Sequence, residues 1–122
     1  MKKKVVIVED DRLLALVLRK MAQSMNLNVV DIAHGGEDAI DSVNTHQPDL
    51  ILMDILLADS TTGIEAMKRI REHSNVPVIY ISAQTDDQLK KDAISVPNSI
   101  FLMKPVLMNE LKSAVSGVQF AA

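Results

Sequence analysis

Short apolar runs alternate along the chain with longer segments in which apolar residues recur every three or four positions. Most of the short runs are unbroken and rich in β-branched residues, which is typical of strands buried on both faces. The longer segments have the periodicity of helices with one apolar face. Predicted strands cover residues 5–8, 29–33, 49–54, 78–81 and 99–103, and predicted helices cover residues 12–25, 37–45, 63–73, 86–95 and 108–118.

The regular alternation of strand and helix favours an α/β fold. It predicts a parallel sheet with right-handed crossovers and with helices on both faces. A chain of 122 residues is long enough to bury a core, and we expect one domain over residues 1–122. The first predicted helix has the widest apolar face, and the fourth has one of the thinnest. The residues expected to form the face of the first helix are Leu13, Leu14, Leu16, Val17, Leu18 and Met21.

Composition and charge remove several classes of function. A net charge of −3 argues against direct binding of nucleic acid or of an anionic membrane. Without cysteine there is no disulfide framework, thiolate metal site or thiol catalysis, and the apolar run at residues 5–8 is too short for a signal peptide or a membrane span. The three histidines have polar neighbours and are predicted to lie at the surface; they are His34, His46 and His73.

Polar side chains follow four of the predicted strands at the point where each strand ends. Glu9 and Asp10 follow the first, Asp54 ends the third, Ser82 follows the fourth and Lys104 follows the fifth. Because the carboxyl ends of parallel strands meet at one edge of a sheet, these groups can converge. Three neighbouring carboxylates repel one another unless a cation is present, and Mg²⁺ prefers hard oxygen ligands. The remaining lysine and hydroxyl are suited to an added phosphoryl group.

Each of these residues also has a purely structural interpretation. Glu9 and Asp10 could cap the first helix, and Asp54 could cap the turn that follows it. Ser82 could be a turn hydroxyl and Lys104 a solvated side chain. We favour metal ligation for the two acids because Asp54 needs a nearby cation. We expect the next acid, at position 11, to cap the first helix rather than bind metal.

Four short motifs, each at the end of a predicted strand, resemble those of the response-regulator receiver domain. They are VVIVEDD at residues 5–11, LILMD at residues 50–54, VIYISA at residues 78–83 and FLMKP at residues 101–105. The resemblance covers essentially the whole chain, and the motifs occur in the family's order. It implies a flavodoxin-like (βα)5 fold with a five-stranded parallel sheet in the order 2-1-3-4-5.

The resemblance also implies a phosphoryl acceptor and a metal site. Asp54 would accept a phosphoryl group from a phosphohistidine on a sensor histidine kinase or a phosphotransfer domain. Asp10 and Asp54 would bind Mg²⁺ directly, together with the backbone carbonyl of Leu56, and Glu9 would assist through water. The protein would be no enzyme in the wider sense, because it would catalyse only its own phosphorylation and dephosphorylation.

The same resemblance implies how the signal leaves the site. Ser82 and Lys104 would contact the phosphoryl group, and Phe101 would be the aromatic switch residue. The bond between Lys104 and Pro105 would be cis. The face made by the fourth helix, the fifth strand and the fifth helix would bind a downstream effector or a second copy of the chain. The family is cytoplasmic, and we expect the same location here.

Two alternatives and two departures from the family pattern accompany this hypothesis. A small aspartyl-phosphate phosphatase of the haloacid-dehalogenase type would need a second Asp two positions after Asp54, where this chain has Leu56. A scaffold with the receiver fold but no phosphorylation would not need the complete set of acids, hydroxyl and lysine. The loop after Asp54 lacks the usual proline. Before the fifth strand, Pro97 and Asn98 replace the common Gly-Ala.

Overall fold

The computed structural model describes residues 2–57, 61–83 and 87–120, and it contains every predicted strand and helix. In chain order they are β1 (Lys4–Val8), α1 (Arg12–Ser24), β2 (Asn28–Ala33), α2 (Gly36–His46), β3 (Leu50–Asp54), α3 (Gly63–Arg71), β4 (Val78–Ser82), α4 (Asp87–Ile94), β5 (Ser99–Met103) and α5 (Met108–Gly117). Asp86, the expected first residue of the fourth helix, and positions 58–60 of the loop after Asp54 lie outside the described residues.

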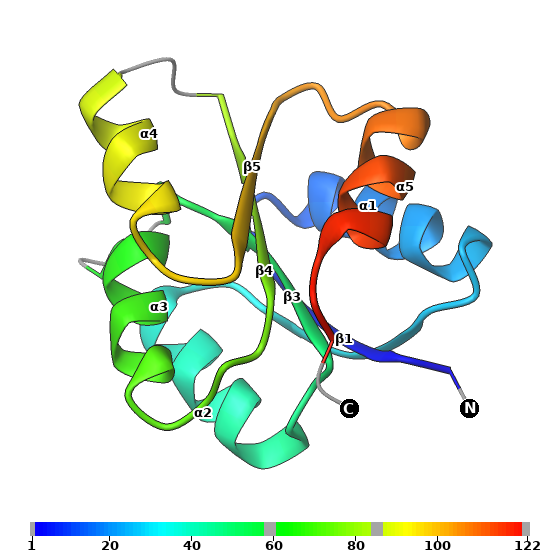
Figure 1. Ribbon diagram of the computed structural model, residues 1–122. Helices are drawn as coiled ribbons and strands as arrows, with labels where there is room; N and C mark the ends of the chain where they lie inside the picture. Colours follow the sequence, from blue (N-terminus) through cyan, green and yellow to red (C-terminus); the bar gives the residue numbers. More distant parts are fainter. Residues whose placement is uncertain (1, 58–60, 84–86, 121–122) are drawn as a thin grey trace.

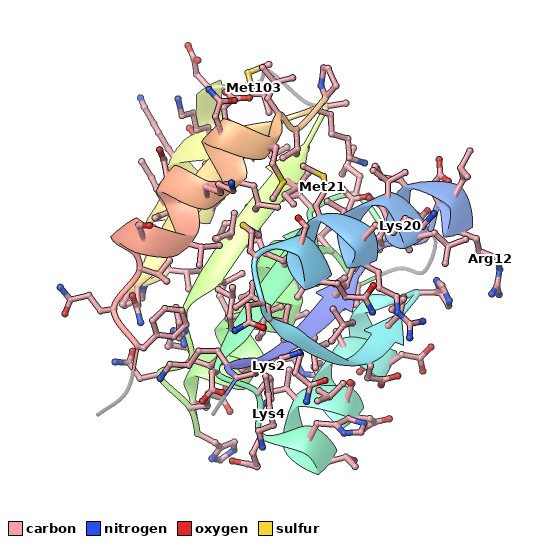
Figure 2. The ribbon with its side chains drawn as sticks, turned by 90° about the vertical axis from the view of Figure 1, so that its right-hand side faces the viewer. Lys2, Lys4, Arg12, Lys20, Met21 and Met103 are labelled. Carbon is pink, nitrogen blue, oxygen red and sulfur yellow. The ribbon has the colours of Figure 1, made fainter. Side chains whose placement is uncertain are left out.

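The five strands form one parallel sheet in the order β2-β1-β3-β4-β5, which confirms the flavodoxin-like fold. Helices α1 and α5 cover one face of the sheet, and α2, α3 and α4 cover the other (Figure 1). Figure 2 shows Lys4, at the start of β1, and Met103, at the end of β5, toward opposite sides of the view. They mark the amino and carboxyl edges of the sheet.

Alternate residues of the central strands build two hydrophobic cores. Ile51 and Met53 of β3 face the layer of α2, α3 and α4, whereas Leu50 and Leu52 face α1 and α5. All four side chains are fully buried. Burial of such a side chain contributes about 1.5–3 kcal/mol. The sheet is therefore a rigid support that fixes the positions of the residues at its carboxyl edge.

Three side chains of α1 are exposed that the sequence predicted to be buried. Leu13, Leu16 and Val17 are 73%, 51% and 45% exposed, although the sequence placed them on the buried face. Of the predicted face, Leu18 is buried and Leu14 and Met21 are partly buried, and two alanines of the same stripe are buried with them. Apolar residues surround most of the first turns of α1, so periodicity could not select one face. The small alanines let the helix approach the sheet along this stripe, and the three side chains outside it remain in solvent.

Local features at the ends of elements agree with the sequence. The carboxylate of Asp11 caps α1 by accepting hydrogen bonds from the backbone amides of Leu13 and Leu14 at 3.0 and 3.1 Å. The bond between Lys104 and Pro105 is cis, as the resemblance implied. Within the described part of the chain, no helix has the length and apolar content needed to cross a membrane.

Candidate functional site

The carboxyl edge of the sheet brings three acids and one lysine together. Glu9, Asp10 and Asp54 each present a carboxylate oxygen within 4.8 Å of the others. The Nζ atom of Lys104 lies 3.1 Å from Oε1 of Glu9 and 3.3 Å from Oδ2 of Asp54. Glu9 and Asp54 are only 1% and 6% exposed, and Ser82 is buried at the neighbouring strand end. The predicted convergence is confirmed for the three acids and Lys104, and Ser82 lies at the end of the neighbouring strand.

Crowded negative charge and burial shift the pKa values of two groups in this cluster. The pKa of Glu9 is raised from 4.5 to about 7, first by burial and then by Asp54, against a lowering contribution from the backbone amide of Asp11. Burial lowers the pKa of Lys104, but its hydrogen bond to Glu9 and the two neighbouring carboxylates raise it overall. The lysine thus stays charged and is the counter-charge closest to the buried acids.

The backbone around Glu9 is held by several contacts that the sequence did not predict. The amide of Asp11 donates to Oε2 of Glu9 at 3.2 Å. Nδ1 of His34 lies 2.8 Å from the carbonyl oxygen of Glu9, and because a carbonyl only accepts, Nδ1 carries the proton. The histidine is half-buried rather than at the surface, where we had expected it. His46 is also half-buried, whereas His73 is exposed as predicted.

A further residue that the sequence analysis missed is Gly63, the first residue of α3. A Cβ atom at this position would lie 2.2 Å from the carbonyl oxygen of Asp54 and 2.9 Å from Cγ of Met53. The Gly63 amide donates to the carbonyl of Ile55 at 2.8 Å, which closes the loop after β3. Only glycine lets α3 approach β3 this closely. Its position at the start of a predicted helix was the available signal.

The expected switch residues lie on adjacent strands. Ser82 of β4 is opposite Met103 of β5, and Tyr80 is opposite Phe101. Phe101 is half-buried, packs against the core under α2, α3 and α4, and has Nζ of Lys90 5.7 Å from its ring centroid. Its position next to β4 and α4 suits a switch, although the switching role stays a prediction.

The donor set at the cluster fits a hard divalent cation. Three carboxylates lie close enough to share one ion, and Mg²⁺ prefers such oxygen ligands. Oε1 of Glu9 is buried, and its contact among the described residues is the ion pair with Lys104 at 3.1 Å. Glu9, Asp10 and Asp54 are therefore the residues that could hold Mg²⁺. Leu56 is exposed, and its carbonyl stays a predicted ligand only.

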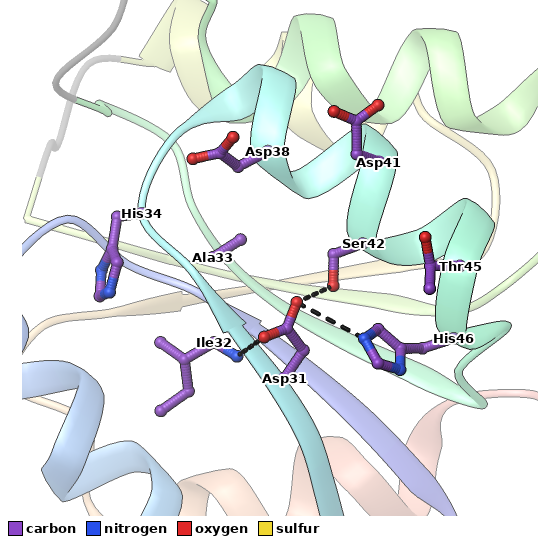
Figure 3. A pocket seen from close by; sticks show the side chains of 9 residues that line it. All are labelled: Asp31, Ile32, Ala33, His34, Asp38, Asp41, Ser42, Thr45 and His46. Carbon is purple, nitrogen blue, oxygen red and sulfur yellow. Dashed lines mark hydrogen bonds and ion pairs between the residues drawn. The ribbon is translucent and has the colours of Figure 1, made fainter.

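A separate polar pocket of about 290 Å³ lies between β2 and α2, and none of the three acids lines it (Figure 3). Asp31 of β2 accepts hydrogen bonds there from Ser42 Oγ at 2.6 Å and from the Ile32 amide at 2.9 Å, and Nε2 of His46 lies 3.7 Å away. The register between β1 and β2 also skips Val30. A bulge and a charged residue are typical protection for an exposed sheet edge such as β2.

Comparison with known proteins points to one family. The sequence profile described as "Response regulator receiver domain" matches residues 5–116. The response regulator ArlR of Staphylococcus aureus is 31% identical over 114 residues, which are 93% of this chain and 51% of ArlR. The chain thus spans about half the length of the curated relatives it matches.

Solved structures support the same assignment. The signal receiver domain of a modulated diguanylate cyclase from Desulfovibrio desulfuricans G20 is 31% identical with a TM-score of 0.87, over 97% of this chain and 94% of that one. A chain in the CheX-CheY-BeF3-Mg+2 complex from Borrelia burgdorferi is 29% identical with a TM-score of 0.86, over 93% of this chain and 86% of that one. The chain belongs to the response regulator receiver domain family of two-component signalling.

Proposed function

We propose that this receiver accepts a phosphoryl group on Asp54 from a phosphohistidine of a sensor histidine kinase or phosphotransfer domain. The observation that carries the proposal is the nearly buried Asp54 carboxylate, which lies beside the Lys104 ammonium and two further acids. The lysine gives Asp54 a charge partner, and the two further acids complete a candidate cation site. The same proposal confines catalysis to the protein's own phosphorylation and dephosphorylation, and its expected location is the cytoplasm.

The residues of the cluster have distinct tasks in this reaction. A carboxylate oxygen of Asp54 bonds to phosphorus while the phosphorus–nitrogen bond breaks, and the donor leaves as neutral imidazole that keeps the proton on its other ring nitrogen. Bound Mg²⁺, held by Glu9, Asp10 and Asp54, would neutralise charge on the transferring group. Lys104, already 3.3 Å from Asp54, would pair with a phosphoryl oxygen, and Ser82 would donate a hydrogen bond to another.

An apolar surface on α1 supports docking of a helical phosphodonor. The exposed side chains of Leu13, Leu16 and Val17 follow directly after the acidic cluster in the chain. A pocket of about 280 Å³ between α1 and β2, lined in part by Leu16 and His34, adjoins them. Figure 2 shows Arg12 extending from the start of α1. An apolar helix face with adjacent basic side chains suits a partner that carries an apolar stripe and acidic residues.

The proposed output surface is the face of α4, β5 and α5. A groove of about 430 Å³ runs along β5 and α5, and its lining includes the apolar side chains of Ile100, Leu102 and Ala114. We propose that phosphorylation shifts the population of conformations of this face. Its ligand would be a downstream effector or a second copy of the chain. The chain in the Borrelia burgdorferi complex is described together with CheX, BeF3 and Mg, which is consistent with partner binding by an activated receiver.

The proposal is tested by incubation with a small phosphodonor and Mg²⁺, followed by intact mass measurement. We expect one phosphoryl group on the wild-type chain and none on Asp54→Asn. Asp41→Asn is the matched control, because Asp41 is exposed on α2. Labelling of Asp54→Asn to the wild-type extent, with circular dichroism showing an intact fold, would exclude Asp54 as the acceptor.

A further inference from the structure

Helix α4 is firmly attached at its carboxyl-terminal end. Ala93 and Val96 are 0% and 3% exposed, and both belong to the core shared with α2 and α3. The hydroxyl of Ser99, the first residue of β5, donates to the carbonyl of Val96 at 2.7 Å and lies 3.4 Å from that of Ala93. This end of the helix is therefore fixed by both apolar burial and hydrogen bonds.

The amino-terminal half of α4 has more exposed side chains. Asp87, Gln88 and Lys90 are exposed, and Leu89 is half-buried at the margin of the core. Nζ of Lys90 lies over the ring of Phe101, a type of contact that is weak at exposed sites. High exposure of the side chains is a feature of a segment that moves at low free-energy cost.

Arg71, at the end of α3, is hydrogen-bonded to the turn between α4 and β5. Its Nη1 atom donates to the carbonyls of Ser74 and Val76 at 3.0 and 2.6 Å, and its Nη2 atom donates to the carbonyl of Pro97 at 2.8 Å. One guanidinium thus connects the loop before β4 with the turn before β5. Its fork of donors is well suited to hold several acceptors in fixed positions.

Asn98 makes a second set of connections at the same place. Its Nδ2 atom donates to the carbonyls of Asn75 and Gln119 at 3.1 Å each, and its Oδ1 atom lies 3.4 Å from the amide of Gln119. Its backbone has φ of 57°, a left-handed conformation that Gly and Asn adopt more readily than other residues. The Gly-Ala common in the family places Ala at position 98, which is less suited to this backbone conformation, and neither of those residues offers a side-chain amide for these bonds.

We propose that Arg71 and Asn98, which we call the basal clamp, make the carboxyl-terminal end of α4 a fixed pivot. The inference rests on the proposed function, because the motion it describes is the response to phosphorylation at Asp54. When Ser82 moves toward the phosphoryl group, the amino-terminal turn of α4 swings and the contact between Lys90 and Phe101 changes. The clamped turn and the segment after α5 stay in place. The departure at Pro97 and Asn98 thereby directs the conformational change to one end of the helix.

Backbone amide NMR with and without beryllofluoride and Mg²⁺ tests the pivot. In the wild-type chain we expect shift changes that are large at residues 87–90 and small at 93–98 and at Gln119. Asn98→Gly keeps the left-handed backbone but removes the side-chain bonds, so changes should then extend to residues 93–98 and to Gln119. Asn75→Ala is the control, because Asn75 contributes its backbone carbonyl to the clamp. Uniform changes along α4 in the wild type, or an unchanged gradient in Asn98→Gly, would overturn the pivot.

Hydrogen exchange of the unphosphorylated chain separates this inference from the proposed function. The pivot requires slower exchange at the Val96 and Gln119 amides than at the first α4 amides that are bonded within the helix. It also requires a loss of protection at Gln119 of about fivefold in Asn98→Gly, the effect of one hydrogen bond. A chain that shows this pattern but no response to beryllofluoride would refute phosphorylation at Asp54 and leave the clamp intact. Equal exchange at both ends of α4 would refute the clamp whatever the response at Asp54.

Discussion

Burial of Glu9 beside Asp54 predicts that the metal-free protein loses stability as the pH rises. The pKa of Glu9 is raised from 4.5 to about 7 in the folded chain, so between these values the folded state binds more protons than the unfolded state. The stabilisation is therefore complete below about pH 4.5 and is lost as the pH rises through about 7. A pKa change of this size corresponds to at most about 3 kcal/mol of unfolding free energy.

Glu9→Gln removes this titration and keeps the size of the side chain. In EDTA, we expect the variant to match the wild type near pH 5 and to exceed its stability by up to about 3 kcal/mol at pH 8. Urea unfolding at pH 5, 6, 7 and 8 measures the free energy of unfolding of both proteins. The histidines are the same in both, so their titration cancels in the difference between variant and wild type. Glu72→Gln, at an exposed position after α3, is the matched control and should follow the wild type.

Saturating Mg²⁺ provides the second half of this test. If Glu9 helps to hold the cation, the wild type should gain more stability from Mg²⁺ at pH 8 than Glu9→Gln does, because the cation offsets the charge of the buried carboxylate. A Glu9→Gln variant that follows the wild-type pH dependence in EDTA would contradict the assignment of the buried charge to Glu9. A variant that is less stable than the wild type at pH 8 would contradict it equally.

Three other substitutions test separate parts of the structure. Asp10→Ala should lower Mg²⁺ affinity, measured by calorimetry, by at least about tenfold, while the stability of the metal-free protein, measured by urea unfolding, holds or rises. A large loss of metal-free stability with unchanged Mg²⁺ affinity would identify Asp10 as a helix cap only. Gly63→Ala should destabilise the fold by about 1–3 kcal/mol because the added methyl group clashes with the Asp54 carbonyl. A variant as stable as the wild type would refute the close approach of α3 to β3. Tyr80→Phe should be neutral or stabilising by up to about 1 kcal/mol, because the buried Tyr80 hydroxyl has no hydrogen-bond partner among the described residues. A loss of about 2 kcal/mol or more in the free energy of unfolding would show that the hydroxyl has a partner.

The sequence predicted the fold and the acidic cluster because both depend on strongly periodic segments. Unbroken apolar strands can only be buried on both faces, and parallel strands bring their carboxyl ends to one edge. The sequence alone therefore places Glu9, Asp54 and Lys104 together. Their roles came from the order of the motifs and not from the geometry of the sheet.

Features that depend on packing between distant segments were not predictable in the same way. The face that α1 buries is decided by how closely Ala15 and Ala22 approach the sheet, and apolar residues at nearly every position of the first turns obscured it. The contact of His34 with Glu9 joins the residues that directly follow two strands, and polar neighbours in the sequence concealed it. The bonds of Asn98 likewise join two loops and the segment after α5.

The central claim is that Asp54 carries the phosphoryl group, and chemical mapping of the label tests it most directly. The chain is incubated with a small phosphodonor and Mg²⁺, the acyl phosphate is reduced with borohydride, and the modified residue is located by peptide mass spectrometry. We predict that Asp54 is converted to homoserine, that the conversion depends on Mg²⁺, and that Glu9 and Asp10 of the cluster and the control residue Asp41 are unmodified. Modification of Glu9 or Asp10 in place of Asp54, or equal conversion in EDTA, would contradict the account.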